Sequence, residues 1–147
     1  MRKILIAFGL IWVFVWCGVG FYLGSQHMPH IQEMEKLAQE GNLVEFWNTM
    51  NVWKLRASSH SHALGFTSLL ILVALVMPDM RFSDRAKKVL GILLIVGVVL
   101  STIFGWFLFL PLVLLGEVLV VSMVLMSFIG IMRGLREKGM AAQQGED

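Results

Sequence analysis

Hydrophobic residues in this chain are concentrated in long runs that polar stretches separate. The first run covers residues 4–24 and is almost continuously apolar, and about 20 such residues cross a hydrocarbon core of about 30 Å. Residues 89–132 form a longer run with one charge, Glu117, which as a single helix would measure about 66 Å, twice what a bilayer needs. This run therefore predicts two spans with a turn near Pro111, because proline fits the first turn of a new helix and disrupts the interior of an old one.

The whole pattern predicts an all-α membrane protein with four transmembrane helices in a single domain that covers the chain. The expected spans are 4–24, 62–78, 89–108 and 112–132, joined by a long loop at 25–61 and a short loop at 79–88, with a C-terminal tail at 133–147. We expect Pro78 to end the second span and the tail to fray from Gly139 onward. A cleaved signal peptide is the alternative for the first run, but its end, residues 20–24, is bulky and lacks a small-x-small cleavage pattern.

The long loop itself contains two helical patterns. Apolar residues recur at helical spacing in both: Ile31, Met34, Leu37 and Ala38 in the first, and Leu43, Phe46, Trp47 and Met50 in the second. Gly41 lies between the two runs and predicts a helix end. We therefore expect two short amphipathic helices that lie on the membrane or cover the end of the bundle, with Trp47 and Trp53 at the interface. Ser58 or Ser59 is expected to cap the second span.

Composition supports the membrane assignment and excludes several classes of function. Of the 147 residues, 57% are hydrophobic and 15% are charged, whereas a soluble domain carries about 25% charged residues. The net charge of +2 is too small to indicate a nucleic-acid partner. Cys17 is the single cysteine, so an internal disulfide is impossible, and the C-x-x-C-H signal of covalent haem attachment is missing. Phosphate-binding loops and hydrolase motifs are also missing from the sequence.

Basic residues predict the orientation of the spans. Arg2 and Lys3 precede the first span, four basic residues lie in the loop at 79–88, and three more follow the last span at 133–138. All of these fall on one side of a four-span protein, and positively charged loops face the cytoplasm. We expect a multi-pass protein of the bacterial inner membrane with both termini in the cytoplasm. The long loop and the turn near Pro111 then face outward.

With this topology, Glu117 and all four histidines are predicted to lie toward the outer side. Glu117 is six residues past Pro111, which places it about 9 Å below the outer end of the fourth span. A carboxylate inside a span is costly, so it usually faces the bundle interior, finds a partner and marks function. The nearest partners by depth are Ser59, His60, Ser61 and His62. The alternative is that Glu117 pairs with a buried hydroxyl or histidine and only fixes the packing.

The histidines are candidate ligands for a metal or a haem. His60 and His62 are two residues apart, and on a regular helix their side chains point about 200° apart, so only a non-helical turn would let both bind one metal ion. Otherwise an inward imidazole binds haem iron, copper or zinc, and Glu117 orients its other ring nitrogen. His27 and His30, together with Met28 or Met34, offer a soft ligand set suited to copper. The alternatives are interfacial hydrogen bonding for His60 and His62, and an ordinary solvated loop for His27 and His30.

The stretch His60-Ser61-His62-Ala63-Leu64-Gly65-Phe66 resembles the His-x-His-x-x-Gly helix starts of small bacterial four-helix membrane proteins. It is also distantly similar to helix starts in the haem-copper oxidase and nitric oxide reductase superfamily. That resemblance implies His60 or His62 as a haem ligand near the outer face. This chain departs from those enzymes because it has four expected spans, not twelve, and no histidine in the middle of a span. A binuclear oxygen-reducing centre is therefore not implied.

Three functions follow as hypotheses. The first is a redox or metal-handling membrane protein that binds b-type haem or copper through His60 and His62, with Glu117 as supporting residue or proton relay. The second is a non-catalytic accessory or assembly subunit whose partners are other membrane subunits or further copies of the chain in the lipid bilayer. The third is a quinone site, since histidine, carboxylate and tryptophan at one interface are able to hold a quinone head group.

Overall fold

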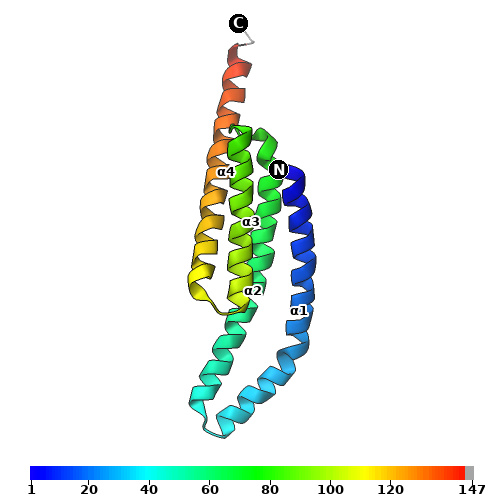
Figure 1. The fold of residues 1–147 in the computed structure, drawn as a ribbon, viewed down its shortest axis with the longest axis vertical. Coiled ribbons are helices and arrows are strands. Elements are labelled where there is room, and N and C mark those ends of the chain that lie inside the picture. The colour runs from blue at the N-terminus through cyan, green and yellow to red at the C-terminus, as the bar shows by residue number, and fades with distance from the viewer. Residues whose placement is uncertain (145–147) are drawn as a thin grey trace.

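The computed structural model describes the backbone of residues 1–144 and the side chains of residues 1–137 and 140. Over these residues the fold consists of four long α-helices and one short 3-10 helix (Figure 1). The elements are α1 (Arg2–Gln39), α2 (Leu43–Val76), η1 (Met77–Asp79), α3 (Asp84–Trp106) and α4 (Leu110–Gln144). Each α-helix is long and apolar enough to cross a membrane. The prediction of an all-α, four-helix membrane fold is confirmed, and the chain is an integral membrane protein with several spans.

Consecutive helices run antiparallel and pack mainly on their neighbours in the chain, α1 on α2, α2 on α3 and α3 on α4. Met1 and the C-terminal end of α4 lie at the same end of the bundle, as an even number of spans requires (Figure 1). We call the opposite end, where α3 turns into α4 at residues 107–109, the turn end. At the turn end α1 and α2 continue past α3 and α4 as a helical hairpin, the α1–α2 extension. At the other end α4 alone continues outward.

The α1–α2 extension corrects the prediction for residues 25–61. These residues are helical, and Gly41 ends α1 with a left-handed φ of 70°, but the two runs are continuations of α1 and α2 and not separate short helices. Pro29 lies inside α1, which bends toward α2 in its second half (Figure 1). Ser58 and Ser59 do not cap a helix, because α2 begins earlier and the side chain of Asn42 accepts the capping hydrogen bond.

The α3–α4 hairpin follows the prediction more closely. α3 ends at Trp106, Leu108 takes a positive φ of 63° in the turn, and Pro111 is the second residue of α4. Pro78 lies in η1 directly after α2, as expected for the end of the second span. The C-terminal prediction is wrong in part, because α4 continues through Gly139 to Gln144; residues 145–147 of the expected tail lie outside the described residues.

Close contact between α3 and α4 fixes how these helices sit against each other. A Cβ atom added at Gly116 would collide with the backbone nitrogen of Ser101 and lie 2.7 Å from the carbonyl oxygen of Gly97. Gly97 in turn faces the carbonyl oxygen of Gly116 at 3.0 Å from its own added Cβ. Small residues allow helix backbones to approach in this way where lipid surrounds the bundle. The register of α4 at residue 116 is therefore set by backbone contact.

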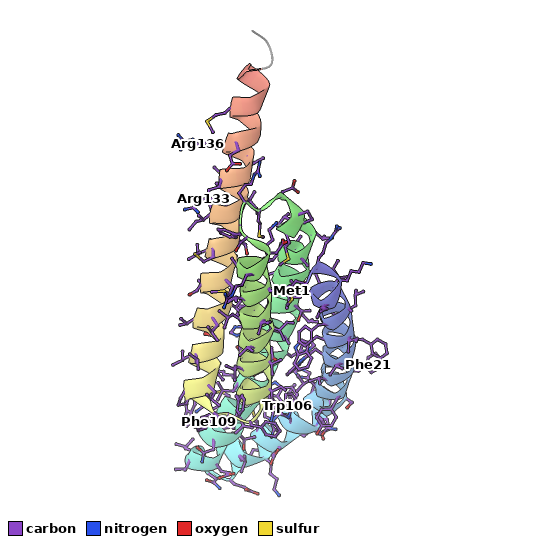
Figure 2. All side chains as sticks on the ribbon, turned by 45° about the horizontal axis from the view of Figure 1, so that its top comes forward. Met1, Phe21, Trp106, Phe109, Arg133 and Arg136 are labelled. Carbon is purple, nitrogen blue, oxygen red and sulfur yellow. The ribbon has the colours of Figure 1, made fainter. Side chains whose placement is uncertain are left out.

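The apolar surface of the bundle is uneven. α3 is the most buried of the spans, whereas α1 and α4 bury the least of their apolar windows. Phe21 on α1 is 88% exposed and points away from the bundle (Figure 2). In a bilayer such faces contact lipid or another protein chain.

Candidate functional site

A contact between side chains of α2 and α4 joins two of the residues predicted to be functional. The Nδ1 atom of His62 lies 3.0 Å from Oε1 of Glu117. Glu117 is seven residues past the start of α4, which places it about 10 Å along that helix from the turn end. The turn therefore precedes Pro111 and not Glu117. The prediction that Glu117 finds its partner among residues 59–62 is confirmed for His62.

The local fold explains why these two side chains meet. Gly116 is held against α3 by backbone contact, so the next residue, Glu117, has a defined direction on α4. His62 lies well inside α2, where the helix backbone is regular, and its ring is 5.3 Å from the ring of Phe66 one turn further along. The pair is thus positioned by rigid helices and not by a loop.

The pair has two useful chemical states. With a neutral imidazole, Nδ1–H donates to the Glu117 carboxylate and Nε2 is left as an acceptor or ligand atom. With an imidazolium, Nε2–H becomes a donor while the carboxylate balances the charge. The side chains of His62 and Glu117 are 42% and 30% exposed. A ligand at the surface of the bundle therefore has access to the pair.

His60 faces a different part of the molecule. Its ring lies against Gly20 of α1, where a Cβ atom would be 2.7 Å from Nε2, and its centroid is 6.4 Å from that of Trp16. Its Nδ1 atom is buried without a hydrogen-bond partner within the described part of the chain. The groove beside it, about 660 Å³, is lined by residues of α1 and α2. The structure therefore places His60 and His62 on different faces of α2, as regular helical spacing requires, and not in one site.

His27 and His30 lie in the α1–α2 extension, apart from the His62–Glu117 pair. The ring of His30 stacks on Trp53 at 4.4 Å with an interplanar angle of 13°, and the ring of His27 is 5.9 Å from the same tryptophan. Met28 is exposed. Aromatic stacking between the two helices thus accounts for the placement of both histidines. The copper set predicted from His27, His30 and a methionine gains no support from this arrangement.

A metal site with several protein ligands is not assembled in the described part of the molecule. Across the residues that the structure describes, no group of three or more histidine, cysteine, aspartate or glutamate side chains is close enough to hold a metal ion. The four histidines are divided among three surroundings: the Glu117 carboxylate, the Trp16–Gly20 face of α1, and Trp53. The arrangement offers one oriented imidazole, His62, and not a cluster.

Sequence reasoning missed an aromatic row along α1. The rings of Phe8 and Trp12 are 5.2 Å apart, those of Trp12 and Trp16 are 6.4 Å apart, and Trp16 meets Trp106 of α3 edge-on at 6.2 Å. The spacing of four between residues 8, 12 and 16 was a visible signal for one helical face.

Sequence reasoning also missed Arg56, whose guanidinium lies over the Trp106 ring at 5.4 Å. That contact links residues 50 positions apart and leaves no local sequence signal.

Comparison with known proteins adds no assignment. A scan against protein-family models, a search of curated proteins and a search of solved structures each gave no match for this chain.

Proposed function

We propose that this protein binds the head group of a lipid-soluble quinone at the His62–Glu117 pair and takes part in a redox reaction of the membrane. The observation that carries the proposal is the 3.0 Å contact between His62 Nδ1 and Glu117 Oε1 across two apolar spans. An intramembrane carboxylate that is paired with an oriented, partly exposed imidazole is a functional site by default. A quinone reaches such a site sideways through the bilayer.

The two states of the pair match the two states of a quinone. A quinone carbonyl accepts a hydrogen bond from Nε2–H of the imidazolium, and a quinol hydroxyl donates to Nε2 of the neutral ring. Oxidation of a quinol to a quinone releases two protons and two electrons. One hydroxyl proton passes to Nε2 while Glu117 holds the proton on Nδ1 and balances the charge, and the proton of the second hydroxyl passes to water. The two electrons pass to a separate electron-transfer protein that carries a metal redox centre. Phe66, 5.3 Å from the His62 ring, supplies an aromatic face beside the head group.

A b-type haem is the second candidate, and the same contact favours it. A carboxylate that holds one imidazole nitrogen orients the other nitrogen as a ligand, so His62 Nε2 would be the residue atom that binds the iron. The distant similarity of residues 60–66 to haem-binding helix starts points the same way. Copper fits the residues less well, because it is bound by several nitrogen and sulfur ligands and the described histidines are dispersed. A purely structural role as an accessory subunit is the remaining alternative, supported by the exposed faces of α1 and α4.

We place the protein in a bacterial inner membrane with both termini in the cytoplasm. The support is the set of basic residues at the end of the bundle that carries the termini, among them Arg133 and Arg136 on α4 (Figure 2). The His62–Glu117 pair then lies in the outer leaflet. Labelling with an impermeant reagent tests this orientation, with single cysteines introduced into a Cys17→Ser background at the turn end and in the loop 79–88.

The identity of the ligand is tested on protein purified in mild detergent. Organic extraction followed by mass spectrometry measures bound quinone, and oxidised and reduced absorption spectra measure haem on the same sample. We expect near-stoichiometric quinone in the parent, less in His62→Ala, and the parent's amount in His60→Ala, which changes the other face of α2. A Soret band in the parent that is missing from His62→Ala would show that the bound group is haem and not a quinone. A colourless sample without quinone would support the accessory-subunit alternative.

A further inference from the structure

Arg56 carries a positive charge at the turn end without a partner anion in the described part of the molecule. Its guanidinium carbon is 5.4 Å from the Trp106 ring centroid, and Trp106 is the last residue of α3. The ion pairs found among the described residues do not include Arg56, and its Nε atom is buried without a hydrogen-bond partner. A half-buried guanidinium in this state is costly, because no paired anion offsets the loss of water around it.

Two clefts lie beside Arg56 in the α1–α2 extension, with volumes of about 200 Å³ and about 260 Å³. Arg56, Glu33, His30 and Trp53 line both of them, and Glu45 lines the second. His30 and Trp53 stack on each other, which forms an aromatic wall between α1 and α2. A molecule in either cleft therefore meets the Arg56 guanidinium of α2 and the Glu33 carboxylate of α1.

The aromatic residues beside Arg56 are of the kinds that gather at the level of lipid head groups. Arg56 is level with Trp106, and the ring of Tyr22 is 6.5 Å from the Trp106 ring. Trp106 and Phe109 mark the turn end in Figure 2, and tryptophan and tyrosine gather at membrane–water interfaces. Charged residues of the α1–α2 extension, Glu33 and Glu45 among them, lie on the aqueous side of this level.

We infer that Arg56 and Glu33 bind the head group of a zwitterionic phospholipid with a primary ammonium, of the phosphatidylethanolamine type. The guanidinium fork binds the phosphate through charge-assisted hydrogen bonds. The ammonium, with three N–H donors, serves the carboxylate of Glu33. Glu45 is eleven residues from Arg56, about 16 Å along α2, and is too far away to contact the same head group. A phosphatidylglycerol head group would satisfy Arg56 but bring no cation to Glu33. A choline head group has no N–H donor for this carboxylate.

The test uses the full chain reconstituted into bilayers of phosphatidylcholine with equal fractions of phosphatidylethanolamine and phosphatidylglycerol. After extraction in mild detergent, native mass spectrometry counts the retained lipids of each class. Arg56→Gln is compared with Lys54→Gln, which removes a charge from the same helix two residues away on an exposed position. Glu33→Gln is compared with Glu35→Gln in the same way. Arg56→Lys keeps the positive charge, so it still tests the role of the guanidinium if Arg56→Gln fails to fold.

We expect the parent to retain phosphatidylethanolamine in preference to the other two lipids. Arg56→Gln lowers that retention about tenfold, the usual effect of losing a charge-assisted hydrogen bond, while Lys54→Gln matches the parent and Arg56→Lys lies between them. Glu33→Gln shifts the preference toward phosphatidylglycerol, and Glu35→Gln does not. Soluble phosphoethanolamine does not displace the lipid at equal concentration.

Three results would overturn the inference. If the parent retains the three lipids equally, the bound lipid is ordinary lipid from the surrounding bilayer and the site has no preference. If Arg56→Gln and Lys54→Gln retain equal amounts of phosphatidylethanolamine, Arg56 does not bind the head group. If Arg56→Gln and Glu33→Gln lower thermal stability alike without changing lipid retention, the two residues form an internal ion pair in solution. Displacement by soluble phosphoethanolamine would assign the clefts to a free head-group compound in place of a lipid.

Discussion

Replacement of Gly116 by alanine is the sharpest test of the packing that positions Glu117. The added Cβ would collide with the backbone nitrogen of Ser101 and lie 2.7 Å from the carbonyl oxygen of Gly97. Both neighbours are backbone atoms in α3, so neither moves by a change of rotamer. Relief requires α4 to shift away from α3.

The magnitude follows from two opposing effects. Alanine is favoured over glycine in a helix by about 1 kcal/mol, whereas overpacking of a tight interface costs typically about 1–3 kcal/mol. Because the contacts are with backbone, we place the overpacking cost at the upper end of that range, and the net destabilisation is about 2 kcal/mol. A shift of α4 also displaces Glu117 from His62.

The assay is reversible unfolding of the purified protein in mixed micelles, with Gly65→Ala on α2 as the matched control. An added Cβ at Gly65 meets no described atom within 4 Å, so this variant is expected to gain up to about 1 kcal/mol from helix propensity alone. If Gly116→Ala is as stable as Gly65→Ala, the close approach of α3 and α4 is not present in the protein.

Two further changes test other parts of the fold. Gly41→Ala places a side chain at a φ of 70° in the turn after α1 and is expected to cost about 1–2 kcal/mol of stability. Gly24→Ala, inside α1, should cost nothing, and equal melting temperatures for the two variants would contradict the turn. Arg81→Gln removes the 2.7 Å ion pair between Arg81 and Glu137, whose side chains are 62% and 46% exposed. Thermal unfolding should therefore show a loss of stability of at most about 1 kcal/mol. A larger loss would mean that the pair is buried in the membrane-embedded protein.

Much of the membrane fold was predictable because it depends on rules that act locally. The length of each apolar run sets the number of spans, and Pro111 marked the α3–α4 turn because proline is favoured in the first turn of a helix. The partnership of Glu117 and His62 was predictable by depth, since the helical rise converts sequence position into height along the bundle. The opposite directions of His60 and His62 followed from the same geometry.

The α1–α2 extension was less predictable because contacts between helices decide it. The first span was expected to end at residue 24, yet α1 continues through Pro29 with a bend, and the stack of His30 on Trp53 ties this part of α1 to α2. Ser59 looked like a cap by residue type, but its hydroxyl donates to the carbonyl of Leu55 inside a helix that begins earlier. The position of Arg56 over Trp106 depends on the packing of α2 against α3, which no local pattern encodes.

The most direct measurement of the proposed function is calorimetric titration of a short-tailed quinone into the purified protein. We expect His62→Ala and Glu117→Gln to weaken binding by roughly 10- to 100-fold, the effect of losing a hydrogen bond to a charged group, while His60→Ala binds as the parent does. Equal affinity in the parent and in His62→Ala would contradict the assignment of the His62–Glu117 pair as the binding site.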